Sequence, residues 1–438
     1  MRILMISGEF PPMQGGVGDY TREIARAFAV QGHRVWVLVP HALQDAYPQR
    51  EAQPWHVLPA IRNWKWGCWR PILSALHETQ PDVVHVQYQA ATYDMRIPAI
   101  NLLPWRLRCQ ADSPPVVVTF HDLKPPYLFP KAGPLRKWTL RLLARHSAAV
   151  ILTNAEDLSA ASAWPFARQP AELVSDGRSA STPSNQRRMP HARTTQPPTD
   201  ALRRHHPTLH QIPIGSNIAV APPASFDRSV WRTRLGYRPG DFVWAYFGFL
   251  NESKGGETLI RALARSIPGT HLLMIGGRVG SSDRTNQAYA ARMEALMGEL
   301  GVTERVRWTG YVPAKEVSAA LLSADILVLP YRDGVSFRRG SLHAALVHGC
   351  AIVSTVPRVP LPDFRDGENI LLVPPGEPEA LTQAALCLQC DPALRLRIGV
   401  GAEALAQQFT WQQIARRTVE EVFQPLVAAR QARRRARR

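Results

Sequence analysis

The chain has 438 residues, of which 45% are hydrophobic and 20% charged, and its 52 lysines and arginines outnumber its 35 acidic residues to give a net charge of +17. This length and composition fit two or three folded domains. They exclude a wholly disordered chain, a collagen-like rod and a disulfide-stabilised miniprotein. The basic excess leaves nucleic acid, a membrane surface and an anionic substrate to be distinguished as partners.

The predicted elements of the first third form one domain. Short β-branched runs alternate with longer segments of helical period, which is the pattern of a parallel sheet covered by helices on both faces. The clearest helix buries Tyr20, Ile24, Ala27 and Phe28 on one face and is predicted to end at Gly32. The predicted strands are 3–6, 35–39, 83–86, 116–120 and 150–153. We therefore expect a doubly wound domain over residues 1–166.

Two segments depart from this pattern. Residues 167–206 are rich in Ser, Thr, Pro, Gln and Arg and almost empty of large apolar residues, which predicts a flexible insertion. Residues 430–438 hold six arginines in nine positions, so charge repulsion predicts that the tail over 427–438 is disordered. Together the two segments carry about ten units of the net charge.

A second series of strands follows the insertion. It comprises 243–247, 272–275, 306–309, 326–329, 351–354 and 370–373, each followed by a loop with Gly or Pro and then a helical pattern. This series predicts a second doubly wound domain over 207–407, and helical spacing predicts a further helix over 408–426. Two domains of this kind bind ligands outside the carboxyl ends of their strands, in the cleft that they share.

Three loops rich in glycine follow predicted strands and open predicted helices. Glycine allows close approach of the backbone, and a helix N-terminus offers free amides and partial positive charge to an anion. None of the loops matches GxGxxG or the Walker pattern, and each alone is also consistent with a turn carrying solvated side chains. Taken together, they favour one phosphorylated ligand. The residues expected at this anion are Gly16, Lys254, Arg338, Arg339, Gly340 and Ser341.

The cysteines and apolar runs bear on the compartment. Five scattered cysteines argue against a disulfide framework and favour a reducing cytoplasm. Cys387 and Cys390 form an isolated CxxC without a second pair, so no metal site is expected. The N-terminus lacks the apolar core of a signal peptide, and no run reaches the roughly 20 apolar residues of a membrane span.

Several segments, taken in order, resemble glycosyltransferase family 4. They are FPPMQGGVGDYTREIARAFAVQGHRVWVL, VVVTFHD, IPIGSNI, YFGFLNESKGGETLIRAL, VRWTGYVP and ILVLPYRDGVSFRRGSLHAALVHGCAIVST. The resemblance implies the GT-B fold, in which two Rossmann-like domains face each other across a cleft. It also implies a retaining, metal-independent enzyme that needs no cofactor and uses a nucleotide-diphosphate sugar as donor. The helix over 408–426 would return to the N-terminal domain.

The resemblance also implies the roles of individual residues. The N-terminal domain would bind the acceptor and the C-terminal domain the nucleotide sugar, with His121 near the transferred sugar. The expected catalytic residues are His121, Lys254 and Arg338, the last two stabilising the leaving diphosphate. The expected donor-binding residues are Gly16, Phe249, Lys254, Tyr311, Val312, Asp333, Arg338, Arg339, Gly340, Ser341 and Leu342.

The sequence departs from the family at two places. Phe249 stands where an arginine is common, and the family's pair of glutamates falls on Ser336 and Ala344. The RRGSL-type loop indicates a branch of the family. Arg338 is the candidate for the replaced arginine, and Asp333 for a replaced carboxylate.

These features predict a cytoplasmic hexosyltransferase of polysaccharide biosynthesis that acts on a glycan or lipid-linked acceptor. The missing glutamates leave open a non-catalytic nucleotide-sugar-binding or scaffold protein. Segment 135–146, LRKWTLRLLARH, is basic and amphipathic, and it either contacts an anionic membrane or covers the N-terminal sheet. A lipid-linked acceptor would place the protein at the inner face of the membrane. Nucleic acid is disfavoured because no zinc-finger or RRM signature is present.

Overall fold

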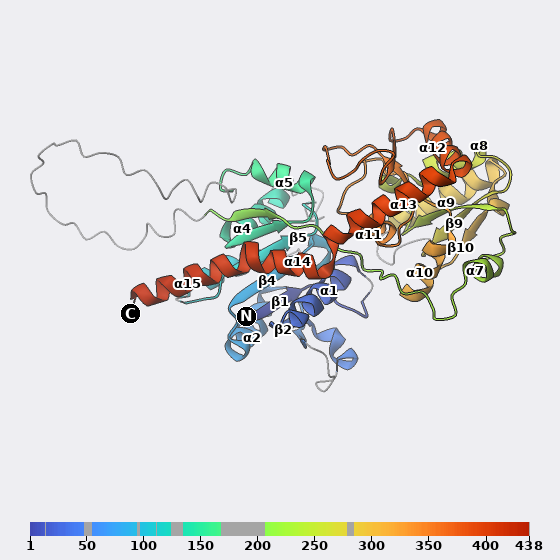
Figure 1. Ribbon diagram of the computed structural model, residues 1–438. Helices are drawn as coiled ribbons and strands as arrows, with labels where there is room; N and C mark the ends of the chain where they lie inside the picture. Colours follow the sequence, from blue (N-terminus) through green and yellow to red (C-terminus); the bar gives the residue numbers. More distant parts are fainter. Residues whose placement is uncertain are drawn as a thin grey trace, which may run out of the picture. The chain divides into compact units, whose positions relative to one another are not determined.

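The computed structural model describes residues 1–13, 15–47, 55–93, 97–110, 112–123, 135–167, 206–277 and 284–437. The chain divides into two compact units, Met1–Pro213 with Ile414–Arg438, and Ile214–Gln413. Each unit is built on a parallel sheet with helices packed against it (Figure 1). The predicted insertion over 167–206 lies, apart from its two end residues, outside the described residues.

The first unit has seven strands among its described residues, in the order β3-β2-β1-β4-β5-β6-β7. They are β1 (Arg2–Ser7), β2 (Arg34–Pro40), β3 (His56–Ile61), β4 (Val83–Tyr88), β5 (Val116–Phe120), β6 (Ala149–Leu152) and β7 (Thr208–Gln211). The five predicted strands are confirmed, and the edge strands β3 and β7 are additional. Because β7 pairs with β6, the predicted start of the second domain at residue 207 is wrong.

Helices and 3-10 turns cover this sheet, and the first helix has the predicted buried face. Tyr20, Ile24 and Phe28 are buried in α1, and Gly32 follows its end at a φ of +81°. The elements between the strands are α1 (Gly16–Val30), η1 (His41–Ala46), η2 (Trp66–Cys68), α2 (Trp69–Thr79), η3 (Ala90–Thr92), η4 (Ile100–Leu102), α3 (Leu103–Arg108), α4 (Leu135–His146) and α5 (Ala155–Ser162). No helix in the described ranges is both long and apolar enough to cross a bilayer.

The C-terminal segment belongs to the first unit from Ile414 onward. It consists of α14 (Trp411–Arg417), a π-helical turn (Thr418–Phe423) and α15 (Gln424–Arg437). The Phe423 ring lies 5.7 Å from that of Phe28 and 5.3 Å from that of His85.

The prediction of a disordered tail over 427–438 is wrong as far as Arg437, because these residues continue α15. Alanine, glutamine and arginine all favour the helical state, and the preceding helix removes the cost of nucleation. Arg430 and Arg434 donate hydrogen bonds to the backbone carbonyl of Asp112. Arg434 also lies 3.3 Å from the carboxylate of Asp112. These contacts offset part of the repulsion between the arginines.

The second unit has six strands among its described residues, in the order β10-β9-β8-β11-β12-β13. The strands are β8 (Phe242–Phe247), β9 (Thr270–Ile275), β10 (Val306–Trp308), β11 (Ile326–Leu329), β12 (Ile352–Thr355) and β13 (Leu371–Val373). The other elements are α7 (Arg228–Arg234), η7 (Glu252–Lys254), α8 (Gly256–Arg265), α9 (Arg284–Glu299), η8 (Thr303–Arg305), α10 (Ala314–Ser323), α11 (Gly340–Val347), α12 (Pro378–Cys390), α13 (Pro392–Ala406) and η9 (Gln407–Phe409). All six predicted strands are confirmed, within two residues at their ends.

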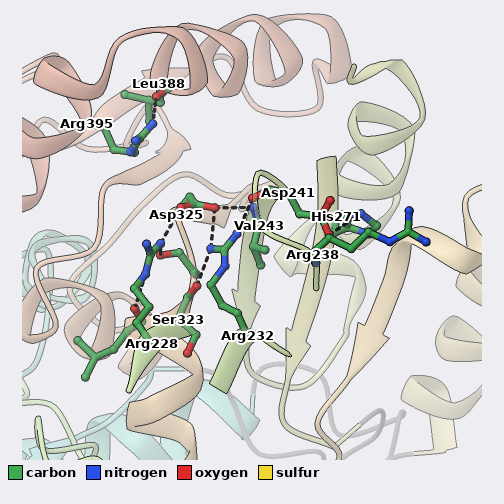
Figure 2. A network of polar contacts seen from close by, with 12 residues as sticks. Arg228, Arg232, Arg238, Asp241, Val243, His271, Ser323, Asp325, Leu388 and Arg395 are labelled. Atoms are coloured by element: carbon green, nitrogen blue, oxygen red, sulfur yellow. Dashed lines mark hydrogen bonds and ion pairs between the residues drawn. The ribbon is translucent and has the colours of Figure 1, made fainter. Parts of the chain in front are cut away.

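A network of ion pairs and hydrogen bonds links the amino ends of strands β8 and β11 to helix α7. Asp325, directly before β11, accepts hydrogen bonds from Arg228 at 2.6 Å, from Arg232 at 3.0 Å and from the Val243 amide at 2.7 Å (Figure 2). The carboxylate thereby joins α7 to β8 and β11. Both Asp325 and Arg232 are nearly buried.

The strand order fixes where each unit can bind a ligand. In the first sheet the order reverses between β1 and β4, and in the second between β8 and β11. At such a switch point the loops at the carboxyl ends of the two strands diverge, which leaves a crevice open to ligands. The loop residues 248–255 and 330–339 follow β8 and β11 and therefore lie at the switch point of the second unit.

Candidate functional site

The two loops at the switch point of the second unit are in direct contact. The Arg332 amide donates a hydrogen bond to the Ser253 carbonyl at 2.9 Å, and the Arg332 guanidinium pairs with Glu252 at 2.8 Å. Gly255 has a φ of +72°, and a Cβ atom there would lie only 1.8 Å from the carbonyl oxygen of Pro330. Only glycine therefore allows this approach of the two loops.

Lys254 lies at the end of the first of these loops. The Asn251 side chain accepts a hydrogen bond from the Lys254 amide at 3.2 Å and so fixes the turn η7. The Lys254 ammonium lies beside Gly248, where a Cβ atom would be 3.0 Å from Nζ. Burial, and secondly the nearby guanidinium of Arg339, lower the pKa of Lys254 to about 8.

Arg338, Arg339 and Asp333 come from the second loop. Asp333 forms ion pairs with both arginines, and its carboxylate oxygens lie 2.5 and 2.6 Å from the Arg339 guanidinium. That guanidinium also stacks 4.9 Å above the ring of Tyr331, whose hydroxyl is 2.7 Å from Ser341 Oγ. The Nε atom of Arg339 is buried and has no partner in the part of the chain that the structure describes. The predicted carboxylate and arginines are thus together.

The cluster carries an excess of positive charge. Lys254, Arg338 and Arg339 contribute three positive charges, and Asp333 contributes one negative charge. Two cations close enough for one to lower the pKa of the other are stabilised by an anion that binds to both. The excess of two charges equals the charge of a diphosphate diester.

The start of α11 adds backbone donors to this cluster, but one predicted residue does not take part. Among the described residues, the amides of Gly340 and Ser341 have no hydrogen-bond acceptor. Leu342, in contrast, is fully buried in the core, and its amide donates to the Arg339 carbonyl at 3.0 Å. The structure therefore contradicts the prediction that Leu342 binds a ligand, because neither its side chain nor its amide is available.

The remaining predicted residues of this unit lie in neighbouring loops. The Tyr311 side chain is 73% exposed, whereas Val312 packs against the core. Their loop is tied to the end of β9 by a hydrogen bond of 3.0 Å from the Gly276 amide to Thr309 Oγ1. Phe249 is 39% exposed, so the position where the family commonly has arginine is open to solvent.

In the first unit, the loop after β1 differs from the expectation of free amides. The Glu9 carboxylate accepts hydrogen bonds from the amides of Val17 at 2.8 Å and Gly18 at 2.9 Å, and so caps α1. Burial raises the pKa of Glu9, although both amides favour its ionised form. A Cβ atom on Gly15 would clash with this carboxylate, whereas one on Gly16 would meet nothing within 4 Å. The helix start near Gly16 is thus accessible, but its charge is already offset.

His121 follows β5 and is held from three sides. Its amide donates to the Tyr88 carbonyl at 3.0 Å, its ring centroid lies 4.6 Å from that of Tyr20 in a T-shaped contact, and its Nε2 lies 3.0 Å from Gln87 Oε1. Burial lowers the pKa of His121 to about 3. Gln87 was not predicted from the sequence, although His85 and Gln87 alternate within VVHVQY and so mark one polar face of β4.

Models of two known domain families match the chain. The model described as glycosyl transferase 4-like domain matches residues 15–177, and the model described as glycosyl transferases group 1 matches residues 241–391. Both models describe glycosyltransferase domains, and the chain belongs to the glycosyltransferases that combine them. The matched segments correspond to the two Rossmann-like units, and the predicted resemblance is confirmed.

Curated relatives of this glycosyltransferase align over part of the chain. The D-inositol 3-phosphate glycosyltransferase of Streptomyces bingchenggensis is 27% identical over 234 residues, which are 52% of this chain and 50% of that protein. The protein of the same name from Corynebacterium efficiens is 30% identical over 205 residues, or 45% of this chain and 46% of that protein. The chain spans about half the length of the curated relatives it matches.

Solved structures resemble the chain over nearly its full length. Sucrose-phosphate synthase from Thermosynechococcus elongatus has a TM-score of 0.66 at 20% identity and covers 98% of this chain and 99% of its own. Anabaena HepE in complex with UDP-glucose has a TM-score of 0.65 at 18% identity and covers 96% of this chain and 99% of its own. This likeness confirms the predicted GT-B fold class, with two Rossmann-like parallel-sheet domains.

Proposed function

We propose that this glycosyltransferase moves a hexose from a nucleotide-diphosphate sugar to a glycan or lipid-linked acceptor with retention of configuration. The main support is the cluster of Lys254, Arg338 and Arg339 around Asp333, whose charge excess matches a diphosphate. The cluster lies at the switch point of the second sheet, where doubly wound domains bind nucleotides. The names of the relatives and the UDP-glucose bound by HepE agree with a nucleotide-sugar donor.

The chemistry of this reaction asks chiefly for stabilisation of charge. As the bond between the sugar C1 and the diphosphate oxygen breaks, negative charge grows on the leaving group and positive charge on the sugar ring. Lys254 and Arg339 would meet the growing negative charge, which is an effect of preorganised electrostatics. The acceptor hydroxyl forms the new bond to C1 and passes its proton to the departing phosphate on the same face, which retains the configuration.

The geometry refines the expected roles of the two arginines. Arg339 affects the pKa of Lys254 and has an unpartnered Nε in the described structure. We therefore assign Arg339 the diphosphate contact in place of the family's arginine, while Arg338 supports it through Asp333. The amides of Gly340 and Ser341 complete the binding site, and the loop with Tyr311 and Val312 contacts the base through its backbone.

A donor panel tests this function. Uridine, guanosine and adenosine diphosphate sugars are compared by thermal shift, and released nucleotide and product are then measured with glycan and lipid-linked acceptors. We expect one donor to raise the melting temperature and to be consumed only when an acceptor is present, and NMR of the product to show the donor's anomeric configuration. Binding without release across the panel would favour the non-catalytic binding or scaffold protein. An inverted product would contradict retention.

We also propose that the first unit contacts an anionic membrane, as a lipid-linked acceptor requires. Helix α4 buries Leu140 and Leu143 against the core, so these leucines are not available to lipid. Its outer face presents Lys137, Arg141 and Arg145 with Trp138, which is 55% exposed. Helix α3 packs against α4 and adds Trp105, which is 42% exposed. Exposed tryptophans among cations are typical of surfaces that bind the lipid interface.

Vesicle flotation tests the membrane contact. We expect the protein to float with vesicles that contain phosphatidylglycerol and to remain unbound with vesicles of phosphatidylcholine alone. The double variant Trp105→Ser, Trp138→Ser should reduce binding about tenfold, because each exposed indole contributes to partition into the interface. Leu396→Ser is the matched control, since Leu396 is 69% exposed but lies in the second unit. Equal binding by the double variant and the control would contradict the proposal.

A further inference from the structure

Four polar side chains form a chain of contacts across β4, β5 and the residue that follows β5, at the strand ends that lead into the loops of the first unit. His85 Nε2 lies 2.7 Å from Thr119 Oγ1, and the Gln87 amide nitrogen lies 3.1 and 3.2 Å from the two ring nitrogens of His85. The other end of the Gln87 amide, Oε1, lies 3.0 Å from His121 Nε2. His85, Gln87 and Thr119 have no exposed surface. His121 Nε2 therefore faces a buried side chain of β4 and not solvent.

The position of Gln87 is itself strongly constrained. Gln87 is paired in register with Thr119 of β5, and its carbonyl accepts a hydrogen bond of 2.6 Å from the Tyr93 hydroxyl. His85, on the same face of β4, packs against the rings of Phe28 and Phe423. In the structure the Gln87 amide nitrogen faces the His85 ring and its oxygen faces His121.

This orientation decides which nitrogen of His121 carries the proton. An amide oxygen only accepts hydrogen bonds, so His121 Nε2 must be the donor. In a neutral imidazole the other nitrogen, Nδ1, then has a free lone pair. No hydrogen bond links Nδ1 to any residue that the structure describes. His121 is partly exposed, so Nδ1 is the acceptor that this ring can offer to a ligand.

The surroundings keep the ring neutral. Burial lowers the pKa of His121 to about 3 and that of His85 also to about 3. The titratable groups that face His121 are Tyr20 from α1 and His85 from β4. The carboxylate of the adjacent Asp122 accepts a hydrogen bond from the Gln89 side chain at 3.0 Å. Since the folded pKa is far below the usual value, the His121 ring stays neutral at neutral pH, with one ring proton, and does not cycle as an acid and base.

We propose that Gln87 is a positioning residue that holds His121 in the neutral Nε2–H tautomer, so that Nδ1 accepts a hydrogen bond from a hydroxyl group of the sugar substrate. This inference rests on the proposed function for the identity of the ligand. The role of Gln87 is separate from that function, because the tautomer is a property of the free protein. His121 thus orients a hydroxyl group and transfers no proton.

Nitrogen NMR of the histidine-labelled protein tests the tautomer without any substrate. We expect the His121 ring to show a protonated Nε2 and an unprotonated Nδ1, unchanged from about pH 5 to 8. Gln87→Leu removes the acceptor, so signals of the Nδ1–H tautomer should appear. Gln87→Glu keeps an acceptor at the same position and should keep the Nε2–H tautomer, while its charge should raise the pKa of His121. A His121 ring that carries its proton on Nδ1 in the wild type, or that does not respond to Gln87→Leu, would overturn the proposal.

Kinetics test the link to the sugar. We expect Gln87→Leu to lower turnover of the best donor about tenfold, through lost orientation, while the affinity for the free nucleoside diphosphate stays unchanged. Gln87→Glu should recover most of the turnover. Gln89→Leu is the matched control, because Gln89 bonds to Asp122 and not to His121. Wild-type turnover by Gln87→Leu would overturn the sugar contact. Absence of transfer by the wild type with every donor would instead overturn the proposed function, and the NMR result would still decide the role of Gln87.

Discussion

Lys254→Met should lower the kcat/KM of this enzyme for its nucleotide-sugar donor by about 10²–10³-fold. Methionine keeps the unbranched shape and most of the length of the side chain, and it removes the charge that lies beside Gly248 and close to Arg339. Loss of one preorganised cation or donor at a developing negative charge costs this much in other enzymes. The measurement is initial-rate kinetics with the donor that the panel selects. Lys315→Met is the matched control, since Lys315 is an exposed lysine of the same unit on α10.

The pH dependence gives Lys254 a second signature. With a pKa lowered to about 8, the ammonium of the free enzyme is lost as the pH rises through that value. The kcat/KM of the wild type should therefore fall above about pH 8, and Lys254→Met should lack this decline. A bound diphosphate favours the ammonium, so kcat should decline only at higher pH. If Lys254→Met retained kcat/KM within about twofold of the wild type, Lys254 would not be the diphosphate cation.

The β-branched core strands were predictable because parallel strands buried on both faces consist of continuous apolar runs. The edge strand β3 was not, because Pro59 interrupts its pattern, and a proline is tolerated there only at the edge of a sheet. Strand β7 has the sequence TLHQ, in which only Leu209 is strongly apolar. It was not predicted because it is recognised as a strand only by its pairing with β6. The tail was predicted to be disordered because its arginines repel one another. Asp112, which pairs with Arg434, is distant in the sequence and did not enter that prediction.

In the candidate site, too, the features set by the local sequence were predictable and those set by distant residues were not. The loops with Lys254 and Arg339 were predictable because loops at the carboxyl ends of parallel strands meet at one edge of the sheet. That Arg339 rather than Arg338 lies near Lys254 depends on the stacking on Tyr331, which the sequence does not encode locally. Likewise, the Glu9 carboxylate accepts hydrogen bonds from α1 amides eight and nine positions away. The Gln87 side chain on β4 contacts the His121 ring, which follows β5. Pairings of this kind require the fold.

The network around Asp325 lies at the other end of the second sheet and should govern stability instead of catalysis. Removing its carboxylate leaves the nearly buried guanidinium of Arg232 without its ion-pair partner and leaves the Val243 amide without an acceptor (Figure 2). We expect Asp325→Ala to destabilise the second unit by about 3–5 kcal/mol, the range for one partner lost from a buried ion pair. Asp325→Asn keeps one acceptor and should cost about 1–3 kcal/mol.

Hydrogen exchange of peptides that contain β8 and β11, measured under native conditions, reports this loss for the second unit alone. Glu368→Ala is the matched control, because its pair with Arg365 is more than 60% exposed on both sides and should contribute at most about 1 kcal/mol. A cost for Asp325→Ala no larger than the control's would show that the network is solvated like a surface pair. Because Asp325 precedes β11 whereas the Lys254 and Arg339 loops follow β8 and β11, donor affinity should not change at a temperature where the variant is folded. A variant that lost donor affinity while its exchange stayed protected would place the amino ends of these strands in the binding site, contrary to the assignment made from the switch point.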